Sequence, residues 1–149
     1  IESADQRSKV ACAERGKKYI LDNTQKRMVI SYKMDGGIIV MDKTVPPETL
    51  KCDYLYAING EQPEAILIEL KGTDVAHSLD QMSETLDRFR PFFATMAHVY
   101  GRAVVTSSVP NILANPRYAK LKNKLKVYNG NLKIKERQFL EKDTELGNN

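Results

Sequence analysis

The sequence predicts an α/β protein in which a mixed central sheet is flanked by helices, built as a single domain over residues 1–149. Two observations lead to this fold class. Short segments rich in apolar and β-branched residues, separated by turn residues, follow one another before residue 72 and indicate strands. Beyond them, amphipathic stretches alternate with further apolar segments, a pattern typical of helices that lie on a sheet.

The first elements are predicted from capping and turn residues. Ser3 and Gln6 form a capping box, which predicts a helix over residues 4–21 even though Gly16 weakens its far end. Strands are then expected at 28–33 and 38–41, on either side of an Asp-Gly-Gly turn whose residues tolerate positive φ.

A second hairpin is predicted over strands 52–58 and 65–71, joined through an Asn-Gly turn. The strand at 65–71 begins Ala-Ile-Leu-Ile and is apolar on both faces, as expected of a central strand covered by helices. A long amphipathic helix follows over 74–97, which Pro91 should kink or split, and a buried strand is expected at 103–107.

The last third adds one helix and one strand. Asn115 and the proline after it supply an N-cap and a first helical residue, and a final alternating strand is predicted at 132–135 after an Asn-Gly turn. The tail 143–149 is expected to be frayed.

Composition narrows the classes of protein that the chain can belong to. Hydrophobic residues make up 42% and charged residues 28%, which allows a real core and excludes wholesale disorder. No apolar run approaches the roughly 20 residues that a bilayer-spanning helix needs, and no signal-peptide pattern opens the chain. Cys12 and Cys52 cannot make a disulfide framework, so a reduced, cytoplasmic setting is expected.

Three charged residues at the strand ends stand out chemically. Glu69 and Lys71 end the most apolar strand and, because strand side chains alternate, they project from the same side. Asp53 stands sixteen residues earlier on the preceding predicted strand, where hairpin pairing can bring it beside Glu69. Taken alone, the acid-x-Lys triplet is better explained by a surface salt bridge between Glu69 and Lys71 at a fraying strand end.

Two carboxylates at one strand end repel each other unless a cation joins them. An oxygen-lined site of this kind suits Mg²⁺, with Mn²⁺ as a substitute, and the backbone carbonyl of Leu70 is placed to help. Such a metal polarises a phosphodiester and lowers the pKa of an attacking water, and Lys71 would orient that water or stabilise developing charge.

This arrangement resembles the PD-(D/E)xK nuclease superfamily, whose restriction-endonuclease-like core has the order αβββαβ. The similarity spans roughly residues 4–107, with the C-terminal helix and strand as additions. It matches Asp53 to the first acid of the motif, Glu69 to the second and Lys71 to the lysine, and it implies that the acids bind the metal while the lysine assists the water. The proline of the motif is absent, because Cys52 precedes Asp53.

The same resemblance suggests two further catalytic residues. Many members place a glutamate of the first helix at the metal, for which Glu14 is the candidate, with an exposed helical glutamate as the alternative. Many also carry a glutamine on the helix after the lysine strand, where Gln81 stands. His77, one turn earlier, is better explained as a polar helix residue, and His98 as loop or core packing.

The basic charge is concentrated near the C-terminus. Residues 117–142 contain nine basic and two acidic residues, a local charge of +7 that leaves −3 on the rest of a chain whose net charge is +4. This asymmetry indicates a polyanionic partner, with a solvated lysine-rich face as the alternative. The residues predicted to contact nucleic acid are Arg117, Lys120, Lys124, Lys133 and Lys135.

Together these features predict a Mg²⁺-dependent nuclease acting on nucleic acid, with DNA favoured and structure-selective cleavage, similar to that of Holliday-junction resolvases, preferred over sequence-specific restriction. A homodimer would supply symmetric cleavage. Two alternatives stay open: a catalytically inactive nucleic-acid-binding or assembly module on the same fold, and an unrelated α/β protein with a chance triplet, in which Asp53 and Glu69 lie far apart.

Overall fold

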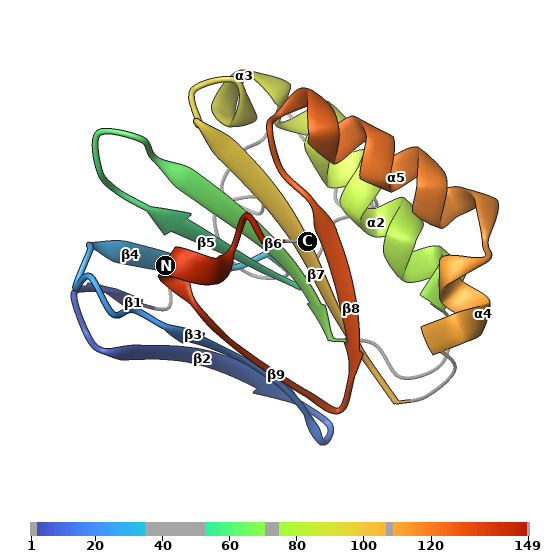
Figure 1. Ribbon diagram of the computed structural model, residues 1–149, viewed down its shortest axis with the longest axis horizontal. Helices are drawn as coiled ribbons and strands as arrows, with labels where there is room; N and C mark the ends of the chain where they lie inside the picture. The colour runs from blue at the N-terminus through green and yellow to red at the C-terminus, as the bar shows by residue number, and fades with distance from the viewer. Residues whose placement is uncertain (1–2, 35–52, 71–74, 107–108, 149) are drawn as a thin grey trace.

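The computed structural model (Figure 1) describes residues 3–34, 53–70, 75–106 and 109–148. Within these residues the protein is an α/β structure with three layers, formed by helices, a six-stranded mixed sheet and a three-stranded sheet. No helix in the described ranges is long and apolar enough to cross a membrane.

The large sheet has the strand order β1-β4-β5-β6-β7-β8. Its strands are β1 (Ser3–Asp5), β4 (Val29–Lys33), β5 (Tyr54–Ile58), β6 (Glu64–Leu70), β7 (His98–Val105) and β8 (Leu132–Glu136). From β1 to β6 neighbouring strands run antiparallel, whereas β6, β7 and β8 run parallel. The predicted hairpin of β5 and β6 is confirmed, and β6 is central and buried as its apolar sequence predicted.

Helices cover one face of this sheet. They are α2 (Val75–Arg88), α3 (Arg90–Phe93), α4 (Val109–Leu113) and α5 (Pro116–Val127), and α2 and α5 lie side by side (Figure 1). Leu79, Met82 and Leu86 of α2 form a core with residues of β6 and β7. The expected long helix is split between α2 and α3 beside Pro91, as predicted, because proline lacks an amide hydrogen and clashes with the preceding turn.

The start of α5 also follows the prediction. The Asn115 side chain accepts a hydrogen bond from the backbone N–H of Arg117 at 2.9 Å, and Pro116 takes the first helical position.

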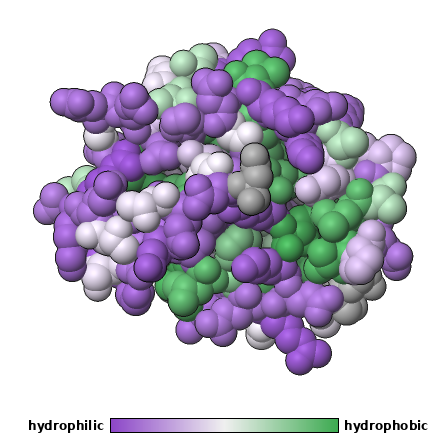
Figure 2. All heavy atoms as spheres, in the orientation of Figure 1, coloured by the Kyte–Doolittle hydropathy of each residue, from purple (hydrophilic) through white to green (hydrophobic). Residues whose placement is uncertain are grey.

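The small sheet covers the other face of the large one. It has the order β2-β3-β9, with β2 (Lys9–Glu14), β3 (Lys17–Asp22) and β9 (Gln138–Lys142), and β3 runs parallel to β9. Tyr19, Leu21 and Phe139 from the small sheet form a second core with Ile66 and Ile68 of β6. Both faces of β6 are therefore covered. Hydrophilic side chains dominate the face seen in Figure 2, and the hydrophobic ones gather mainly in the right half of that view.

The helix predicted for residues 4–21 is wrong, because this segment forms β1, β2 and β3. Burial alternates along it with the two-residue period of a strand, so that Val10 and Cys12 are buried between exposed neighbours. Gly16, which weakened the expected helix, lies in the turn of the β2–β3 hairpin with φ of +80°.

The tail expected to be frayed over residues 143–149 instead begins with packed residues, which corrects that expectation. Residues 138–142 form β9, a strand the sequence did not predict, and a 3₁₀ helix, η1, covers Asp143–Glu145. Leu146 is buried, and Asp143 accepts hydrogen bonds from the Thr24 hydroxyl and the Gln25 N–H. The expected strand at 38–41, its turn and Cys52 lie outside the described residues.

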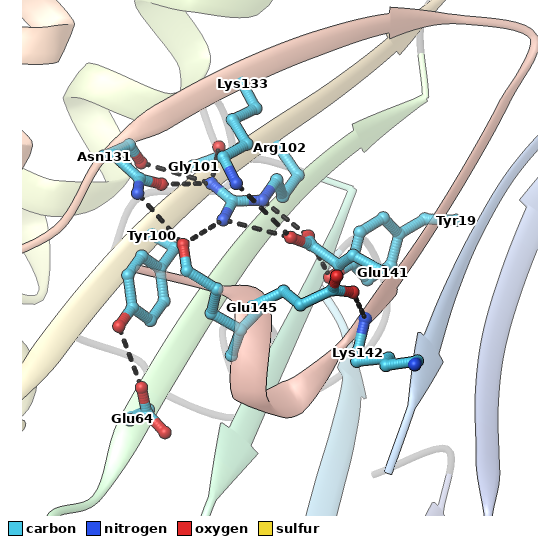
Figure 3. Close-up of polar contacts among 11 residues, drawn as sticks. Tyr19, Glu64, Tyr100, Gly101, Arg102, Asn131, Lys133, Glu141, Lys142 and Glu145 are labelled. Atoms are coloured by element: carbon cyan, nitrogen blue, oxygen red, sulfur yellow. Dashed lines mark hydrogen bonds and ion pairs between the residues drawn. The ribbon is translucent and has the colours of Figure 1, made fainter. Parts of the chain in front are cut away.

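A buried ion pair joins the C-terminal segment to the large sheet (Figure 3). Arg102 of β7 is fully buried, and its Nε lies 2.6 Å from Oε2 of Glu141 on β9. The remaining guanidinium donors bond the carbonyls of Gly101 and Leu146 and the side chain of Asn131. Tyr19 of β3 donates its hydroxyl hydrogen to the same Glu141 oxygen at 2.7 Å. One carboxylate therefore connects β3, β7 and β9.

Removing that carboxylate should destabilise the fold strongly. Glu141→Ala leaves the Arg102 charge buried without its partner, and we expect the free energy of unfolding in urea to fall by about 3–5 kcal/mol. Glu61→Ala, at an exposed site, is the matched control and should change stability by no more than about 0.5 kcal/mol. Equal effects of the two substitutions would contradict this role for the ion pair.

Burial in the second core raises the pKa of the Cys12 thiol to about 12. The reactive thiolate is therefore scarce at pH 8 in the folded protein and more abundant after unfolding. In a Cys52→Ser background, iodoacetamide should modify Cys12 slowly until urea unfolds the chain. Rapid alkylation of the folded protein would show that the thiol is accessible and ionised.

Candidate active site

The structure brings Asp53 and Glu69 together at one end of the β5–β6 hairpin. The antiparallel register pairs Tyr54 with Ile68, so that Asp53, one residue earlier, comes opposite Glu69. The backbone N–H of Leu70 donates to Asp53 Oδ2 at 2.8 Å, which fixes that carboxylate at the end of β6. This is the neighbourhood that the spacing of the two acids predicted.

Both acids lie on the helix-covered face of the large sheet. Leu55, Ala65 and Leu67 pack into the core beneath the helices, whereas Tyr54 and Ile68 face the small sheet. Because side chains alternate along a strand, Asp53 and Glu69 share the face of Leu55 and Leu67.

The two carboxyl groups are almost completely buried, with residue exposures of 3% for Asp53 and 0% for Glu69. Directly opposite residues on one face of an antiparallel pair have Cβ atoms about 5 Å apart, so two ionised side chains here repel each other. Burial in a region of low dielectric strengthens that repulsion and also strengthens the attraction for any cation placed between them. The chemical capacity of this site is therefore to bind a hard cation through oxygen.

Helix α2 lies over the same face and carries two of the polar residues singled out in the sequence. The side-chain oxygen of Gln81 is buried, whereas His77 is exposed. Gln81 therefore belongs to an element that covers the face of the acids. His98 stands apart: its Nδ1 lies 2.7 Å from the Asn129 carbonyl and its ring stacks on Tyr100, which confirms the packing interpretation.

Glu14 is not brought together with the acids. It ends β2 rather than lying on a helix, and its Oε1 accepts a hydrogen bond from the Tyr54 hydroxyl at 3.3 Å. Tyr54 faces the small sheet, so Glu14 lies on the side of the large sheet away from Asp53 and Glu69. The resemblance implied that a glutamate of the first helix lies at the metal, but Glu14 lies on a strand and away from the two acids.

Lys71, the third residue of the motif, lies outside the described residues. Leu70, whose carbonyl was expected to assist a metal, is described and buried at the end of β6. In the described part of the chain, no group of three or more His, Cys, Asp or Glu side chains is arranged to hold a metal ion. The oxygen donors that the structure places together are those of Asp53 and Glu69.

Most of the basic residues predicted to bind nucleic acid have partners within the protein. Arg117 and Lys124 of α5 form ion pairs with Asp80 and Asp87 of α2, at 3.1 and 2.8 Å. These pairs connect the two helices across the surface, and exposed pairs of this kind contribute about 0–1 kcal/mol each. Lys120 is exposed.

The two lysines of β8 face the small sheet. Lys133 Nζ lies 3.9 Å from Glu141, and Lys135 Nζ lies 4.8 Å from the centre of the Phe139 ring. Desolvation, followed by repulsion from Arg102, lowers the pKa of Lys133 from its usual value. The charge count identified these residues as basic but did not show that their side chains are engaged.

Sequence reasoning also missed the basic turn between β2 and β3. The signal was present as Arg-Gly between two segments of alternating residues, a hairpin pattern that the capping box at Ser3 led us to assign to a helix. Comparison of the chain with protein-family models, curated proteins and solved structures finds no match.

Proposed function

We propose that the protein is a Mg²⁺-dependent phosphodiesterase that hydrolyses nucleic acid, with DNA as the favoured substrate and Asp53 and Glu69 as the metal ligands. The observation that carries this proposal is the pairing of two buried acids, one strand apart, at the end of the central strand. Two carboxylates buried on adjacent strands lose hydration and repel each other, and a bound cation would offset both costs.

The donor set fits a hard divalent cation. Carboxylate and carbonyl oxygens are the ligands that Mg²⁺ and Mn²⁺ prefer, and Mg²⁺ retains several waters when few protein ligands are present. When bound, the metal would supply charge neutralisation at the phosphodiester and a more acidic water. Asp53 is already oriented for such a role by its hydrogen bond to the Leu70 N–H.

Lys71 and Gln81 complete the proposed machinery. Lys71 follows Glu69 by two positions, and we assign to its ammonium group the orientation of the attacking water or the stabilisation of charge on the phosphate. Gln81 belongs to the helix over the acid-bearing face, where a neutral amide can hold a water or a phosphate oxygen. The resemblance to PD-(D/E)xK nucleases supports these assignments and favours branched DNA, as cut by Holliday-junction resolvases.

The alternative is a nucleic-acid-binding or assembly module without catalysis. One observation favours it: the hydrogen bond from Leu70 gives Asp53 a structural task at the end of β6. Metal dependence separates the two functions, because a binding module has no reason to cleave DNA or to gain stability from Mg²⁺.

The decisive substitution is Asp53→Asn, which keeps an oxygen acceptor for the Leu70 N–H and removes the charge. We expect Mg²⁺-dependent cleavage of linear and branched DNA to fall by about 100-fold or more, while DNA binding is kept or strengthened because a repelling charge is removed. Glu61→Gln, an exposed charge removal beyond the other end of β5, should cleave like the unmodified protein. Unchanged turnover in Asp53→Asn would overturn the assignment of Asp53 as a metal ligand.

Thermal unfolding offers a readout that does not depend on cleavage. Mg²⁺ at about ten times its dissociation constant should stabilise the protein by about 1.4 kcal/mol, seen as a rise in Tm. Glu69→Gln should abolish that rise, because it removes a charged oxygen ligand of the proposed metal site. Lys71→Ala should lower the cleavage rate and keep the Mg²⁺ effect. A Mg²⁺ effect that survives in Glu69→Gln would place the metal elsewhere.

A further inference from the structure

An open pocket of about 380 Å³ lies between the turn of the β2–β3 hairpin and the corner where β8 passes into β9. It is lined by residues 13–18 and by Arg137 and Gln138. Resting on the proposed function, we propose that Arg15, Lys18 and Arg137 around this pocket form the surface that binds the phosphate backbone of duplex DNA. We call these three residues the corner cluster.

The corner cluster lies at the same end of the sheets as the acids. Arg137 donates its backbone N–H to the Val105 carbonyl at 2.7 Å, at the C-terminal end of β7. The parallel register pairs Leu70 of β6 with Val104 of β7. Arg137 is therefore two strand spacings, about 10 Å, from the end of β6 that carries Glu69.

The hairpin turn approaches the same end from the small sheet. Glu14, directly before the turn, contacts the hydroxyl of Tyr54, the residue next to Asp53. Figure 1 shows the β2–β3 turn and the start of β9 at the end of the molecule where β6 and β7 terminate. The corner cluster thus lies at the end of the large sheet that carries the acids, but on the side of the small sheet, so a duplex would contact both by passing around this end.

The charges of the corner cluster are available to a ligand. Arg15, Lys18 and Arg137 are exposed, and none of them forms an ion pair with another described residue. This distinguishes them from Arg117 and Lys124, whose charges are engaged by acids of α2.

Two neighbours complete the lining without neutralising it. Glu14 is the acid of the pocket, and its carboxylate is held by Tyr54 and lies 3.8 Å from Lys33 Nζ. Lys17 is buried and donates its Nζ hydrogen to the Arg15 carbonyl at 3.1 Å, which supports the turn from within.

The backbone conformation of the two arginines is a separate observation. Arg15 has φ of +47° and Arg137 has φ of +63°, a left-handed conformation that asparagine and glycine adopt with much less strain. Both arginines line one pocket, at the end of the large sheet that carries the acids. Among the described residues Lys26 and Asn129 share this conformation away from the pocket, so the charge and exposure of the arginines, rather than their backbone, point to a ligand.

The left-handed conformation also allows the two charges to be removed without disturbing the turns. Asparagine tolerates the left-handed region, so Arg15→Asn and Arg137→Asn remove the charges and keep both turns. Lys18→Gln completes the set. Lys26→Asn is the matched control, because Lys26 is also exposed and left-handed, with φ of +52°, and it lies beyond the opposite end of β3.

Binding is measured by fluorescence anisotropy with a labelled DNA duplex, in chelator so that no cleavage occurs, over a range of NaCl concentrations. Each phosphate that the protein no longer neutralises lowers the slope of log K against log salt by about 0.9. The triple variant should therefore have a slope smaller by about 2.7 and should bind at least about tenfold more weakly at low salt. Lys26→Asn should bind like the unmodified protein.

Each outcome bears on one proposal. An unchanged slope in the triple variant, an equally large reduction in Lys26→Asn, or no binding by the unmodified protein would overturn the corner cluster as the DNA surface. Salt-dependent binding through the cluster without any Mg²⁺-dependent cleavage would overturn the phosphodiesterase and leave the surface standing. If the triple variant binds DNA without any change and still cleaves it, the corner cluster would be overturned and the phosphodiesterase would stand.

Discussion

The ion pair between Arg102 and Glu141 is the interaction on which the arrangement of the sheets depends. It lies in the layer between the large and small sheets and joins β7 to β9, and through the Tyr19 hydroxyl it reaches β3 as well. A buried charge of this kind is tolerated because every donor of the guanidinium is directed at an acceptor. Its geometry therefore sets where β9 lies, and β9 in turn holds the hairpin of β2 and β3 by parallel pairing.

The elements that the sequence predicted well are those whose pattern is local. The β5–β6 hairpin follows from two apolar segments around an Asn-Gly turn, and the cap of α5 follows from Asn115 and Pro116. The small sheet could not be predicted in this way. Its parallel pair joins Lys18 to Gln138, and no periodicity within one segment reveals a partner that far along the chain. Without that partner, a capping box near Ser3 made a helix the better local interpretation.

The acids of the candidate site were predictable because one hairpin register determines their neighbourhood. Asp53 and Glu69 needed only the pairing of β5 with β6, which the sequence indicated. The family resemblance assigned Glu14 to the metal site as a residue of the first helix, but this segment forms a strand. The ion pairs of the basic residues could not be predicted in this way. Counting charges shows how many lysines and arginines are present, whereas Asp80 and Asp87, which pair with two of them, belong to a different helix.

The parallel pairing of β3 with β9 also has a consequence for how the protein folds. Until β9 is in place, one edge of β3 has its backbone donors and acceptors open. Pairings between such distant segments form late in folding. A folding intermediate that lacks this pairing would thus present an aggregation-prone strand edge to its neighbours.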